Sequence, residues 1–175
     1  MDALTLLTAD HNRVRGLFAR FQTAHEADDL ATATELANKI FTELEVHTTI
    51  EETVFYPAIT DLSDEVHELV VEAYEEHGVA KDLMAEAQGL DPADERWAAK
   101  LKVLIENVEH HAEEEETEMW PPLRKDLSSE KLEALAQALE AKKAELGAPT
   151  LADKIDLTKA ELIDLAKEQE IPGRS

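Results

Sequence analysis

Apolar residues recur at intervals of three and four along most of the chain, which is typical of amphipathic helices with one buried face. The pattern predicts five helices, over residues 2–24, 30–55, 63–89, 93–119 and 129–146. Asp2 and Ser63 suit N-cap positions, because their side chains can accept hydrogen bonds from the first turn of a helix. Pro57 and the pair Pro121-Pro122 are expected to end the second and fourth helices, because proline cannot continue the hydrogen-bond ladder.

Four long helices with short connections predict an all-α fold, an up-down-up-down four-helix bundle. We expect the bundle to occupy residues 1–125, an additional helix packed on it to occupy 126–147, and a C-terminal helical tail to occupy 148–175. The composition agrees with this fold class. Glycine and proline are few, with 5 and 6 residues, and 43% of the chain is hydrophobic while 33% is charged, a mixture that favours helix over strand.

Polar side chains interrupt the apolar stripes of the first four helices at corresponding places. They fall into two matching sets, His11 with His47 and Glu51, and His77 with His111 and Glu115. In both sets a histidine precedes a glutamate by four residues, and the two His-x-x-x-Glu segments lie 64 residues apart. Residues at i and i+4 share one face of a helix, so each segment directs an imidazole and a carboxylate the same way. The 3.6-residue period of an α-helix also predicts Glu118 on the same face as Glu115.

These groups predict a metal site. A buried carboxylate costs several kcal/mol unless it is paired or bound to a metal, and two of them would lie in the core together with four imidazoles. Imidazole and carboxylate ligands suit iron, manganese or zinc, and the absence of cysteine excludes thiolate sites. Six ligands exceed the four of a structural zinc site, which favours two metal ions bridged by two carboxylates.

The order and spacing of these six residues resemble those of hemerythrin-like (HHE cation-binding) proteins, over residues 1 to about 125. The resemblance implies a four-helix bundle with two non-haem iron ions joined by an oxo or hydroxo bridge. It further implies a set of roles: His11 and His47 on one iron, His77 and His111 on the other, and Glu51 and Glu115 as bridges.

The chain departs from the oxygen-carrying members of this family on its third helix. Oxygen carriers have two histidines one turn apart there, whereas His77 has Ala73 before it and Lys81 after it. One iron therefore lacks an imidazole, which leaves a position for water, peroxide or another side chain. Tyr56 and Tyr74 are candidates for that position, with packing in the core as the alternative interpretation for both.

The four-histidine pattern is similar to that of bacterial hemerythrin-like proteins associated with peroxide or nitric oxide, and to that of iron-sensing hemerythrin domains. We therefore expect a protein that reacts with hydrogen peroxide, in a catalase-like or peroxidase-like way, in oxidative-stress defence. The alternatives are a non-enzymatic protein that binds or senses oxygen, nitric oxide or iron, and a metal-free helical interaction module.

Other polar residues near the two sets have less specific interpretations. His110 could pair with Glu114 as a competing ligand set, but it lies one residue off the apolar stripe. His25 and His67 are expected at the surface. Glu52 and Glu116 either hold ligand imidazoles by hydrogen bonds or belong to a solvated face.

The net charge of −23 disfavours nucleic acid and anionic membranes as partners. No apolar run approaches the roughly 20 residues of a membrane span, and the N-terminus has no signal-peptide pattern. We expect a cytoplasmic monomer or weak homo-oligomer whose partners are small molecules: peroxide, oxygen or nitric oxide. The tail resembles the first half of a helix-loop-helix motif found near the N-terminus of transcription terminator Rho, and is expected to be docked or flexible.

Overall fold

A computed structural model describes residues 1–148, and the predicted helical tail over 149–175 lies outside the described residues. Every regular element in the described part is helical, which confirms the all-α prediction. In chain order the elements are α1 (Ala3–Glu26), α2 (Leu30–Ile50), the π-helical segment η1 (Glu51–Phe55), α3 (Tyr56–Ile59), α4 (Asp64–Gln88), α5 (Glu95–Glu114), the π-helical segment η2 (Glu115–Met119), α6 (Trp120–Asp126) and α7 (Ser129–Glu145).

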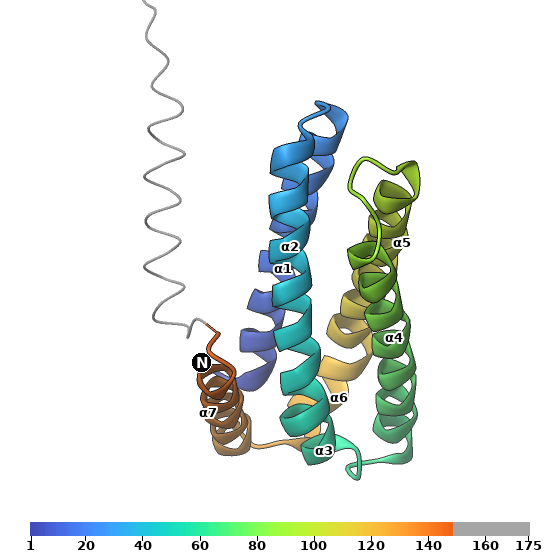
Figure 1. Cartoon of the computed structure of the whole chain (residues 1–175). Helices are drawn as coiled ribbons and strands as arrows, with labels where there is room; N and C mark the ends of the chain where they lie inside the picture. Colours follow the sequence, from blue (N-terminus) through green and yellow to red (C-terminus); the bar gives the residue numbers. More distant parts are fainter. Residues whose placement is uncertain (149–175) are drawn as a thin grey trace, which may run out of the picture.

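The long helices form two antiparallel pairs that pack together as a bundle (Figure 1). Helices α1 and α2 make one pair and α4 and α5 the other, while contacts of α1 with α5 and of α2 with α4 join the pairs. Helix α7 lies outside this bundle and packs against α1, α2 and η1, close to the N-terminus (Figure 1). None of the helices in residues 1–148 is both long and apolar enough to cross a membrane.

The predicted N-caps are confirmed at the first and third long helices. The Asp2 side chain accepts a hydrogen bond from the Thr5 amide at 2.8 Å, and the Ser63 hydroxyl accepts one from the Val66 amide at 3.2 Å. Each cap satisfies a backbone donor that has no partner within its helix.

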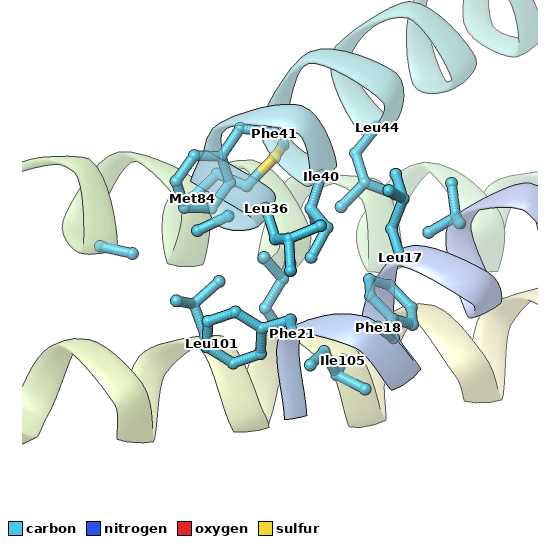
Figure 2. Packing of buried hydrophobic residues seen from close by; sticks show 14 of the residues in the cluster. Leu17, Phe18, Phe21, Leu36, Ile40, Phe41, Leu44, Met84, Leu101 and Ile105 are labelled. Carbon is cyan, nitrogen blue, oxygen red and sulfur yellow. The ribbon is translucent and has the colours of Figure 1, made fainter. Parts of the chain in front are cut away.

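Buried apolar side chains form two clusters along the bundle axis. One lies toward the α1–α2 and α4–α5 turns, and Figure 2 shows its aromatic and aliphatic side chains interlocking between the helices. The other gathers the start of α1, the π segments, α3, α6 and α7. In each of the four long helices the histidine of the two matching sets lies between members of the two clusters. His11, for example, lies between Leu7 and Val14. A buried polar layer therefore separates two apolar cores.

Pro57 and the pair Pro121-Pro122, which were predicted to end helices, do not end them. The chain continues as a helix through Pro57 to Ile59, and through Pro121 to Asp126. A π segment precedes each proline and shifts the hydrogen bonds from i−4 to i−5, as the Tyr56 amide bonds to the carbonyl of Glu51. This register change comes where a proline in an α-helix would lose its bond and clash with the preceding turn.

The π segments also change which side chains face the core. The α-helical period predicted Glu118 on the same face as Glu115, but Glu118 is exposed. Each π segment begins at one of the glutamates of the two matching sets, Glu51 or Glu115. The extra residue in the turn keeps the glutamate inward and rotates the next residues about the helix axis, a change that the 3.6-residue period cannot anticipate.

Candidate metal centre

The six residues predicted as metal ligands lie together in the polar layer. None is more than 6% exposed, and Glu51 is fully buried. Each comes from a different helical element, in the order His11 of α1, His47 of α2, Glu51 of η1, His77 of α4, His111 of α5 and Glu115 of η2. Helical packing thus brings the two matching sets of the sequence to one point.

One group of converging atoms comes from His11, His47 and both glutamates. The Nε2 atoms of His11 and His47 are 3.1 Å apart. His47 Nε2 is 3.1 Å from Glu51 Oε1, and His11 Nε2 is 3.1 Å from Glu115 Oε2. Two imidazole nitrogens and two carboxylate oxygens therefore surround one small volume, which is a donor set that suits a metal ion.

A second group uses the other oxygens of the same two glutamates. The Nε2 atoms of His77 and His111 are 3.0 Å apart. Glu51 Oε2 is 3.2 Å from His77 Nε2, and Glu115 Oε1 is 3.7 Å from His111 Nε2. Each carboxylate consequently offers one oxygen to each group, the arrangement that a bridging ligand between two metal ions requires.

Tyr56 reaches into the second group. Its hydroxyl donates a hydrogen bond to Glu115 Oε1 at 2.7 Å and lies 3.3 Å from His77 Nε2 and 3.4 Å from His111 Nε2. Tyr74, the other candidate from the sequence, is 40% exposed and donates to a backbone carbonyl. Of the two tyrosines, Tyr56 is therefore the one whose hydroxyl lies within the second group.

Trp120 follows the second His-x-x-x-Glu segment as Tyr56 follows the first, but it makes different contacts. Its ring stacks on His11 with the ring centroids 6.2 Å apart and the planes 10° from parallel. Its Nε1 donates to the Thr8 hydroxyl at 3.0 Å. The first group thus has an aromatic wall, whereas the second group has a phenolic oxygen.

Carboxylates hold the outer nitrogens of three of the histidines. The hydrogen-bonded pairs are His11 Nδ1 with Glu116 Oε1 at 2.7 Å, His77 Nδ1 with Glu52 Oε1 at 3.0 Å, and His111 Nδ1 with Glu76 Oε2 at 2.6 Å. Glu52 and Glu116 were among the possible partners from the sequence. Glu76 was missed, although it precedes His77 as Asp10 precedes His11.

The carboxylates at Nδ1 determine whether the Nε2 atoms can bind a metal ion. A carboxylate next to Nδ1 favours the tautomer with its proton there, so that Nε2 presents a lone pair. Neighbouring Nε2 lone pairs then face one another and the carboxylates. Glu51 Oε1 and Glu115 Oε2 are buried and accept no hydrogen bond from the part of the chain that the structure describes. Such a set of buried electron-pair donors fits a bound cation.

In the absence of a metal ion the same carboxylates attract protons. Burial alone lowers the pKa of His47, but the charges of Glu51 and Asp10 outweigh it and raise that pKa to about 10. Burial also lowers the pKa of His111. The neighbouring Glu115 and Glu76 outweigh this effect and raise that pKa to about 9. Burial raises the pKa of Glu51, yet His47 and His77 bring it well below its usual range. Burial, reinforced by Glu115, keeps the pKa of Tyr56 well above 10.

The remaining histidines lie outside the centre. The His110 side chain is 63% exposed, at 3.4 Å from Glu114 and 3.8 Å from Glu76. His25 is exposed and stacks on Phe21, and His67 is exposed beside Thr60. The structure thus places His111, and not His110, in the polar layer.

An apolar cavity adjoins the two groups on the side of the first apolar cluster. All four buried histidines line it, and its other walls include Val14, Phe18, Leu44, Ala80 and Val108. A small molecule inside this cavity would lie beside the four imidazoles.

A helical bundle with imidazoles and carboxylates at its centre defines a helical metal-binding protein. The family model of the Hemerythrin HHE cation binding domain matches residues 2–123, and the chain belongs to this family, which confirms the resemblance found in the sequence. Membership and the buried histidine–glutamate cluster together support metal binding.

Two curated proteins are similar to the chain. One, from Nostoc sp., is named a DNA nickase and is 27% identical over 146 residues, which are 83% of this chain and 40% of that protein. The other is an uncharacterised hemerythrin-like protein of Schizosaccharomyces pombe, 30% identical over 135 residues, which are 77% of this chain and 65% of that protein. The chain thus spans less than two thirds of each. No solved structure matches it.

Proposed function

We propose that the chain holds two non-haem iron ions, bridged by oxide or hydroxide and by the two glutamates. His11 and His47 would bind one ion, and His77 and His111 the other. The observation that carries this proposal is the division of each carboxylate between the two groups, since Glu115 directs Oε2 toward His11 and Oε1 toward Tyr56 and His111. When bound, such an iron pair supplies redox chemistry with small oxidants.

We further propose hydrogen peroxide as the oxidant, in a catalase-like or peroxidase-like reaction that serves oxidative-stress defence. The cavity supports this proposal, because all four imidazoles line it and a small molecule inside it would lie beside them. The protein's own groups orient the site: three carboxylates fix the imidazole rings at Nδ1. Tyr56 keeps its proton on Oη near neutral pH and donates a hydrogen bond to Glu115 Oε1.

Oxygen evolution from peroxide tests this reaction. The iron-loaded protein is expected to release oxygen at a rate at least tenfold above that of the same concentration of free iron, which corresponds to about 1.4 kcal/mol of barrier. Glu115→Gln should lose this activity together with its iron. A rate no better than that of free iron would rule out the catalase-like reaction but not the proposed metal site.

The Tyr56 hydroxyl itself favours a second candidate function. It fills the open side of the second group, so the centre is closed there and could serve to bind or sense oxygen, nitric oxide or iron without turnover. This function predicts a stable adduct with a distinct optical spectrum and little oxygen evolution.

Tyr56→Phe separates a ligand role from packing. We expect the variant to bind the second metal ion about tenfold more weakly, because the phenyl ring keeps the packing and removes the oxygen. Tyr74→Phe is the matched control, since Tyr74 donates only to the Glu52 carbonyl. Metal titration followed by calorimetry should show the affinity of one of the two sites lowered in Tyr56→Phe relative to the parent chain, and neither lowered in Tyr74→Phe. If the metal affinities of both variants equal those of the parent chain, Tyr56 has only a packing role.

The chain's partners under this proposal are small molecules, and its location the cytoplasm, as a monomer or weak homo-oligomer. Cleavage of DNA, which the name of the Nostoc relative states for that protein, is not proposed. A net charge of −23 opposes contact with a phosphate backbone.

A further inference from the structure

Helix α7 carries a lysine on its buried face. The inward residues of this helix are Leu132, Ala136, Leu139 and Lys143, at intervals of four, three and four. Leu146, the last leucine of this segment, is 41% exposed, whereas Lys143 is 1% exposed. A charged group buried at an apolar position destabilises the fold by several kcal/mol unless it is paired. The residue that pairs with Lys143 therefore indicates why a lysine occupies this position.

Lys143 forms a buried ion pair with Asp10 of α1, through its Nζ and Asp10 Oδ2. Asp10 immediately precedes His11, and the same Oδ2 faces His47 Nδ1 at 3.7 Å. A helix outside the four-helix bundle therefore contacts the carboxylate that stands behind one of the four inner histidines.

Because the bundle contains an internal repeat, the surroundings of Asp10 can be compared with those of Glu76. Glu76 precedes His77 as Asp10 precedes His11, and Glu76 Oε2 lies 2.6 Å from His111 Nδ1. At 3.7 Å, Asp10 is beyond hydrogen-bond distance from His47, and His47 Nδ1 is buried without a hydrogen-bond partner among residues 1–148. Of the four inner histidines, His47 alone has no such bond at Nδ1.

The neighbours of the two carboxylates explain the difference. Glu76 faces His110, which belongs to the same helix pair, at 3.8 Å. Asp10 faces the ammonium group of Lys143, which comes from α7. An ammonium group is a compact charge that draws a carboxylate oxygen toward itself, so Lys143 competes with His47 for Asp10.

We propose that Lys143 is a positioning residue through which α7 weakens the metal position of His11 and His47. By holding Asp10 away from His47 Nδ1, it withholds the hydrogen bond that would fix the ring and strengthen Nε2 as a donor. The two positions then differ in strength, and the one that α7 adjoins releases its ion more readily. The inference rests on the proposed assignment of the six ligands.

Release of Co²⁺ to excess EDTA from the full chain, followed by visible absorption, tests this role. The parent chain should lose its two ions in two phases. Lys143→Met removes the charge and keeps an unbranched apolar stem, so we expect Asp10 to close on His47 and the faster phase to slow by about tenfold. Lys143→Arg should restore the parent rate. Lys142→Met is the matched control, because Lys142 pairs within the described residues with Glu145 alone, at 3.1 Å.

A double-mutant cycle with Asp10→Asn decides whether the effect passes through Asp10. The effect of Lys143→Met should vanish in that background. Release that is unchanged, accelerated, or equally altered in both phases would overturn the role of Lys143, as would an effect that persists with Asp10→Asn. A chain that binds no Co²⁺ would contradict the ligand assignment itself, which separates failure of the inference from failure of the proposed site.

Discussion

Replacing Glu115 with glutamine is expected to lower the iron content from two ions per chain to one or none. Glu115 is 2% exposed and directs one oxygen to each group of imidazoles. Glutamine has the same shape, but its amide nitrogen cannot bind a metal ion, so one bridge and at least one ligand are lost. Loss of a partner that only supports a ligand costs about 10- to 100-fold in affinity, and loss of a bridge should cost at least as much.

Glu118→Gln is the control for this substitution. Glu118 lies in the same π segment and carries the same charge, but it is exposed. Elemental analysis and native mass spectrometry after anaerobic loading with Fe²⁺ should show two ions in the control. Two tightly bound ions in Glu115→Gln would contradict the bridging role.

The metal-free and metal-loaded proteins are expected to respond oppositely to pH. The pKa of His47 is raised from 6.5 to about 10, and that of His111 to about 9. A group with a raised pKa in the folded state stabilises the fold fully below its unfolded pKa, and this stabilisation is lost as pH rises through the folded value. The free energy of unfolding of the metal-free protein should therefore fall between pH 6.5 and 10, by on the order of a few kcal/mol.

Glu51 adds a lower limit to that window. Its pKa is well below its usual range in the folded state, so its stabilisation is present above pH 4.5 and is lost as pH falls. Metal binding reverses the upper trend, because the imidazoles must be neutral to bind and protons compete less at high pH. The loaded protein should gain stability relative to the metal-free protein as pH rises.

Urea unfolding at a series of pH values, with and without metal, measures both trends. Uptake of metal near pH 7 should also release protons from His47 and His111, which calorimetry in buffers of different ionisation enthalpy would detect. Parallel pH profiles for the two forms, or binding without proton release, would show that the histidines do not exchange protons for metal.

The six inner residues could be predicted because each replaces an apolar residue on a helical stripe. His11 and His77 stand out for this reason, and the His-x-x-x-Glu repeat places His47 with Glu51 on one face. Helical period and the cost of burying charge are properties of the local sequence. The bundle and its buried polar layer could be predicted from these two properties.

Other parts of the site depend on contacts between helices that the period does not specify. The π segments were missed because the sequence pattern assumes 3.6 residues per turn, and they rotate Tyr56 toward His77. Glu76 reaches His111 on another helix. Lys143 reaches Asp10 across 133 residues of sequence. A lysine at an apolar position of α7 was the available signal for this last contact.

Metal stoichiometry, joined to the identity of the ligands, is the most direct test of the central claim. Fe²⁺ titrated anaerobically into the full chain should saturate at two ions per chain. The His47→Gln and His111→Gln variants should each retain one ion, because the two histidines belong to different groups. Saturation at one ion in the parent chain, or two ions in both variants, would contradict a paired centre built from these residues.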